Sequence, residues 1–92
     1  MIIEGDLIRD SEGQFSIEFL QSDRNKLVYK EADKKTIAFI EQSYDVVSVN
    51  KGSIVRWAEP HSDELIDDLE KNRILGNIEK AILATDCKFE LY

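Results

Sequence analysis

The sequence has one cysteine, one histidine and one proline among its 92 residues. A single cysteine excludes an internal disulfide, and Cys87 lies in an alternating apolar segment, so we expect a buried structural thiol. Zinc sites usually draw several ligands from His and Cys, and the spacing of Glu59, His61 and Asp63 matches no recognised metal motif. We therefore expect no metal and no other cofactor. No catalytic motif stands out, so the chain is predicted not to be an enzyme.

The sequence also lacks a long apolar run. No segment approaches the roughly 18 to 20 apolar residues of a membrane-spanning helix, and the beginning, MIIEGDLIRD, lacks the basic flank and apolar stretch of a signal peptide. We expect a cytoplasmic protein with no leader and no membrane contact. A chain of this length with 42% apolar residues can build one core, so residues 1–92 are predicted to form a single domain.

Residues 59–70 contain no Lys or Arg. Six acidic residues lie there, and the other 13 acidic residues nearly balance the 12 basic residues. Most of the net charge of -7 is therefore concentrated in this block. Such a patch repels nucleic acid and anionic lipid, and it attracts a basic protein surface. The predicted partner is a protein with a basic surface, and nucleic acid is not expected to bind.

Apolar residues alternate with polar residues before residue 58, which is typical of short antiparallel strands. The connections contain residues that favour tight turns, among them Gly13, Asp33 and Gly52. The expected strands cover residues 2–9, 14–21, 27–30, 36–41, 44–49 and 53–57.

After Pro60 the apolar spacing changes to three, four and five residues, which indicates one stripe of a helix. Its members are Ile66, Leu69, Ile74, Ile78, Ala81 and Ile82. The spacing predicts a helix over residues 62–85, with Ser62 or Asp63 as its N-cap. Because glycine is unfavourable inside a helix, Gly76 predicts a close contact with the sheet or a break into two helices.

Residues 87–91 alternate again and complete the predicted order of elements. We expect an α+β fold. An antiparallel β-meander sheet of six to seven strands carries one long C-terminal helix packed on one face, and a short final strand closes the chain.

Each feature near the acidic block has two interpretations. The carboxylates favour the start of a helix through its dipole, and they equally suit a partner-binding patch. Trp57 is typical of a residue that closes one edge of a core, and it also has the make-up of an interface anchor. His61 is expected to pack locally, with partner contact as the alternative.

The second half of the chain resembles a known family. Its segments KTIAFIEQ, SYDVVSVNKGSIVRW and AEPHSDELIDDLEKNRILGNIEKAILATDCKFELY place Ile54, Trp57 and Pro60 before an acidic loop, a helix and a short closing strand. The helix carries Ile74, Ile78 and Ile82. This arrangement, from Lys35 to the end, is similar to the immunity protein 74 family of bacterial polymorphic-toxin systems. The resemblance implies a small cytoplasmic protein that protects its own cell by binding and blocking a cognate toxin.

Charge and resemblance thus lead to the same class of function. An acidic face speeds the capture of a basic enzyme, because complementary potentials raise association rates to about 10⁸ M⁻¹s⁻¹. The alternative is a non-catalytic adaptor or self-associating structural domain, with residues 36–41 as its pairing surface. The predicted partner-binding residues are Trp57, Glu59, His61, Asp63, Glu64, Asp67 and Asp68.

Overall fold

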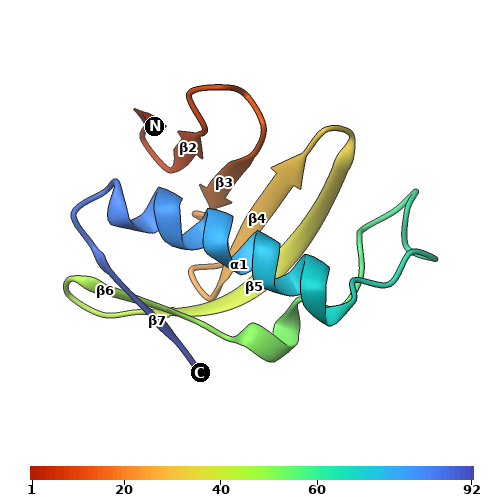
Figure 1. Cartoon of the computed structure of the whole chain (residues 1–92). Coiled ribbons are helices and arrows are strands. Elements are labelled where there is room, and N and C mark those ends of the chain that lie inside the picture. The colour runs from red at the N-terminus through yellow and green to blue at the C-terminus, as the bar shows by residue number, and fades with distance from the viewer.

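The computed structural model describes all 92 residues and contains seven strands in one mixed sheet. The strands follow one another across the sheet in the order of the chain. They are β1 (Ile2–Glu4), β2 (Leu7–Arg9), β3 (Ser16–Phe19), β4 (Lys26–Glu31), β5 (Lys34–Gln42), β6 (Val46–Val49) and β7 (Lys88–Leu91). The sheet curls as a half-barrel around the helix (Figure 1). The predicted α+β fold with a long C-terminal helix is confirmed.

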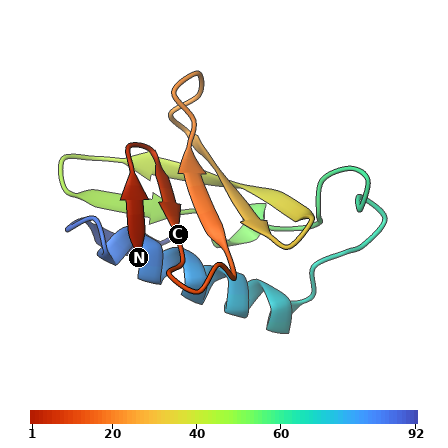
Figure 2. The same ribbon diagram turned by 90° about the horizontal axis from the view of Figure 1, so that it is seen from above.

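The helix α1 (Asp68–Leu83) lies against one face of the sheet (Figure 2). It buries a stripe of Ile74, Leu75, Ile78, Ala81 and Ile82. The predicted start at residue 62 is wrong, because Asp67 is the N-cap and accepts a hydrogen bond from the Glu70 amide. Gly76 neither breaks the helix nor touches the sheet, since nothing would lie within 4 Å of an added Cβ. Leu69 was expected in the buried stripe, but it is 83% exposed.

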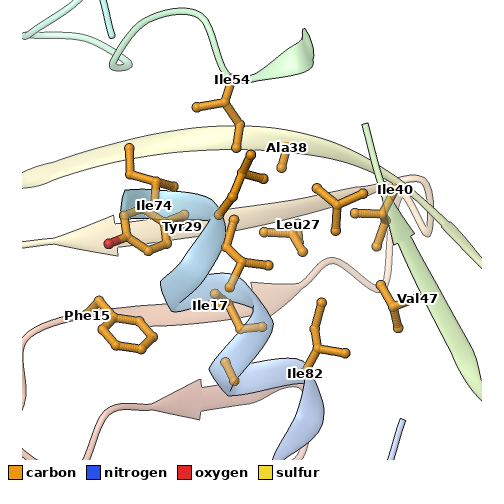
Figure 3. Packing of buried hydrophobic residues seen from close by; sticks show 14 of the residues in the cluster. Phe15, Ile17, Leu27, Tyr29, Ala38, Ile40, Val47, Ile54, Ile74 and Ile82 are labelled. Carbon is orange, nitrogen blue, oxygen red and sulfur yellow. The ribbon is translucent and has the colours of Figure 1, made fainter. Parts of the chain in front are cut away.

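The core fills the space between α1 and the curled sheet. Alternate residues of the central strands point toward the helix, so that Leu27, Ala38 and Ile40 surround it with no more than 1% of their surface exposed (Figure 3). Seventeen buried apolar residues form one cluster. Cys87 packs against this cluster from a partly buried position.

Three predicted strands differ in detail. The stretch 2–9 is a hairpin of β1 and β2, because Gly5, with φ +64°, suits the first position of a tight two-residue turn. The stretch 53–57 is not a strand: the 3₁₀ helix η1 (Lys51–Ser53) overlaps it, and Arg56 alone forms a bridge, to Leu65. The last strand, β7, runs parallel to β6, since the crossover through α1 returns the chain in the same direction.

The residues expected to form an edge, 36–41, belong to β5 inside the sheet. This strand pairs with β4 on one side and, through Ile40 to Gln42, with β6 on the other. Residues 40 and 41 therefore lie inside the sheet, whereas residues 36–39 have β4 as their only strand partner. The open edges belong to β1 and β7.

Candidate functional site

The acidic residues lie on a loop, residues 58–67, that we call the acidic loop. Figure 1 shows this segment extending away from the sheet beyond the N-terminal end of α1. Two backbone hydrogen bonds close its base, one from the Ile66 amide to the Val55 carbonyl (2.9 Å) and one from Trp57 to Glu64 (3.3 Å). A protruding segment with a fixed base is suited to contact another protein.

Trp57 fixes the base of the loop to the core. Its side chain is 3% exposed, and its ring centre lies 6.5 Å from that of Tyr29. The Lys34 ammonium lies 5.6 Å from the centre of the indole ring. Of the two interpretations of Trp57, core packing is therefore the one the structure supports, and the ring is not presented as an anchor.

His61 holds the acidic loop to the turn between β4 and β5. Its Nε2 lies 3.3 Å from the Asp33 carboxylate, and its Nδ1 lies 3.0 Å from Glu64. The other oxygen of Glu64 accepts a hydrogen bond from Lys34 at 2.9 Å. This bond lowers the pKa of Glu64 and raises that of Lys34. His61 and Glu64 thus have local partners that explain their positions.

The six carboxylates of the block divide into two groups. Glu64, Asp67 and Glu70 have structural roles: ion pairs join Glu64 to Lys34 and Glu70 to Arg73, and Asp67 caps α1. The others are directed to solvent. Glu59 accepts a hydrogen bond from the Ser62 hydroxyl, Asp63 has no ion pair or side-chain hydrogen bond, and the Asp68 side chain is 95% exposed, 3.4 Å from Lys71. The block is therefore less uniformly anionic than its sequence implies.

Two exposed leucines, neither of which was predicted to contact a partner, lie among these acids. Leu65 is 67% exposed and Leu69 is 83% exposed. Along the chain, Leu65 and Leu69 lie close to Asp63, Asp67 and Asp68. The sequence spacing could have predicted the exposure of Leu69. This residue is five positions before Ile74, so it lies on a different side of the helix from the stripe that continues through Ile78 and Ile82. We call Asp63, Leu65, Asp68 and Leu69 the acidic-leucine patch.

A second polar cluster, separate from the acidic loop, lies between α1 and β4. Arg73 donates hydrogen bonds to both carboxylate oxygens of Glu31, at 2.6 and 2.8 Å. The Tyr29 hydroxyl donates to Glu31 at 2.8 Å and accepts from Asn77 at 2.9 Å. Burial raises the pKa of Tyr29 to about 12, whereas the Arg73 guanidinium lowers the pKa of Glu31. The cluster joins α1 to β4 and is structural in its geometry.

The His, Cys, Asp and Glu side chains form no group of three or more suited to hold a metal ion. No helix is long and apolar enough to cross a bilayer. The arrangement around α1 and the acidic loop is suited to contact with a protein surface.

No protein-family model, curated protein or solved structure matches the chain. The resemblance to the immunity protein 74 family therefore rests on the residues given above and stays a prediction.

Proposed function

We propose that this protein is an immunity protein of the cytoplasm, which binds a cognate toxin with a basic surface and blocks it. The observation that carries the proposal is the acidic-leucine patch at a protruding end of the molecule. Two large apolar side chains, Leu65 and Leu69, are exposed within a few residues of the uncompensated Asp63 and the exposed Asp68. Interfaces combine such apolar contacts with a charged rim, so the patch has both parts of a binding surface.

The two kinds of side chain have different tasks in this proposal. Glu59, Asp63 and Asp68 attract the basic surface of the toxin over a distance and speed the encounter. Leu65 and Leu69 lose their remaining contact with water in the complex and slow its dissociation. The ion pair of Lys34 with Glu64 and the cap at Asp67 keep the patch in shape, and no catalytic turnover is involved.

Co-expression with the protein encoded immediately upstream tests the proposal. The two chains are captured together, and their association and dissociation rates are measured at low and high salt. Asp63→Asn with Asp68→Asn should slow association by about tenfold at low salt and have less effect at high salt. Leu65→Ala with Leu69→Ala should mainly accelerate dissociation, by at least about fivefold.

The matched control is Glu12→Gln with Glu79→Gln, which removes two exposed charges that lie outside the patch. Equal effects of the two charge variants would show that only net charge matters and would reject the patch. A tight complex that none of these substitutions weakens would keep an inhibitor but move its interface elsewhere. A stable oligomer with no complex would favour the adaptor alternative.

A further inference from the structure

On the side of β5 that faces away from β4, one position, Ile37, lacks a backbone hydrogen-bond partner. In the pairing of β4 with β5, the Ile40 amide binds the Asn25 carbonyl, so the even-numbered residues of β5 face β4. The amide and carbonyl of Ile37 therefore point the other way, toward residues 54–57. They find no hydrogen-bond partner there, although the Lys35 carbonyl and the Phe39 carbonyl on either side both accept backbone bonds.

Apolar side chains surround this position on the face of the sheet opposite the helix. Ile37, Phe39 and Val55 are 42%, 49% and 50% exposed, and Val28 lies across the strand pair from Ile37. Ile37, Phe39 and Val55 line a groove of about 510 Å³, of which buried Trp57 also forms part. The groove thus combines free backbone groups with an apolar lining, which is how an extended segment is bound at a strand edge.

The charges around the groove indicate the chemistry of its occupant. Arg56 forms no ion pair, and its guanidinium donates only to the Ser62 carbonyl at 3.4 Å. The other basic side chain, Lys26, already has Asp23 at 3.3 Å. The one carboxylate in the lining, Glu59, lies at the loop end and accepts the Ser62 hydroxyl. Arg56 is therefore the one basic side chain of the lining that has no ion pair.

We propose that this groove binds an extended segment of another protein that carries an apolar side chain next to a carboxylate. The backbone of the segment pairs with the amide and carbonyl of Ile37. Its apolar side chain lies between Phe39 and Val55, and its carboxylate pairs with Arg56. Apart from Glu59 at the loop end of the groove, the site uses residues that have no role in the proposed function, and it binds the opposite charge, so it does not depend on that function.

Panning a random linear heptapeptide library against the purified full chain tests the site. We expect enriched peptides in which Asp or Glu lies beside a large apolar residue. A synthetic copy is then titrated against the chain by the fluorescence of Trp57, the only tryptophan and a residue of the groove. Val55→Asp should weaken binding by at least about tenfold, and Arg56→Gln by about fivefold.

Leu83→Asp is the matched control, because it places the same charge at an exposed leucine far from the groove (53% exposed) and should leave affinity unchanged. Replacing the carboxylate of the peptide by an amide should remove the effect of Arg56→Gln. Absence of an enriched acidic and apolar motif, or equal binding to Val55→Asp, would overturn the proposal. Enriched basic peptides that are lost on Asp63→Asn with Asp68→Asn would also overturn it and would assign peptide binding to the acidic-leucine patch.

Discussion

Tyr29 is a fully buried side chain that carries a polar group into the core. Its hydroxyl lies between Glu31 and Asn77, so both its donor and its acceptor capacity are used. Every buried side-chain nitrogen and oxygen in the molecule is satisfied in this sense. The arrangement favours the neutral phenol, because a phenolate would be buried next to the Glu31 carboxylate. This residue makes the stability of the fold sensitive to alkaline pH.

We predict that the free energy of unfolding falls as the pH rises from 10 to 12. The pKa of Tyr29 is raised from 10.0 to about 12 in the folded chain, so the unfolded chain releases the proton first and the contribution is lost with rising pH. The loss should be about 1 kcal/mol between pH 9 and pH 11 in urea titrations.

Tyr29→Phe is the variant to compare with wild type, because lysines also lose their protons between pH 9 and pH 11. The variant loses two hydrogen bonds and is less stable at both pH values, but it should lack the additional fall of about 1 kcal/mol. If wild type and variant lost the same stability between pH 9 and pH 11, the phenol would not be the responsible group.

At the level of the elements, the start of α1 separates two acids that look alike in the sequence. Asp67 caps the helix through the Glu70 amide at 2.8 Å, whereas Asp63 makes no such contact. We predict that Asp67→Ala lowers the free energy of unfolding by about 1 kcal/mol and that Asp63→Ala changes it by less than about 0.5 kcal/mol. Thermal and urea unfolding measure both.

Asp67→Asn distinguishes capping from charge. Asparagine is as good an N-cap as aspartate, so this variant should keep nearly all the stability that alanine loses. A loss in Asp67→Asn as large as in Asp67→Ala would mean that the charge of Asp67, and not its hydrogen bond, stabilises the helix start.

Most elements could be predicted from the sequence because local patterning determines them. Alternation along β3 to β6 reports a sheet with one buried face, and the spacing of Ile74, Ile78 and Ile82 reports a helix on that face. The helix start was misplaced because acidic residues suit both a helix N-terminus and a loop. Residues 53–57 contain alternating apolar residues, yet Ile54 and Trp57 are buried from a segment without strand pairing.

The candidate site was less accessible from sequence, because its partners come from distant positions. Glu64 pairs with Lys34, and His61 contacts Asp33, across about 30 residues of chain. No pattern within residues 59–70 predicts these contacts, so all six carboxylates were expected to be equally free to bind a partner. The exposure of Leu65 could not be predicted from the sequence either, because it depends on where the chain leaves the sheet.

For the whole molecule, the single core has a clear consequence. The one α-helix, α1, packs against the concave face of the half-barrel with side chains such as Ile78, which has no exposed surface. Trp57 belongs to the same cluster of 17 buried residues. Loss of packing anywhere along α1 should therefore reach the sheet and the base of the acidic loop together.

We predict that Ile78→Ala lowers the free energy of unfolding by about 3 kcal/mol, because it removes buried methyl groups and leaves a cavity between helix and sheet. For a chain of this size that is a large share of a total of roughly 5 to 10 kcal/mol. Leu83→Ala, at an exposed position of the same helix, is the control and should cost less than about 0.5 kcal/mol.

Urea unfolding followed by Trp57 fluorescence and by far-ultraviolet circular dichroism measures these changes. The two signals should move together in wild type and in Ile78→Ala, with the same dependence on urea, because sheet, helix and loop base share one core. A fluorescence transition that precedes the loss of helix in Ile78→Ala would contradict this. It would mean that the base of the acidic loop separates from the core first, so the patch and the groove beside it would open without global unfolding.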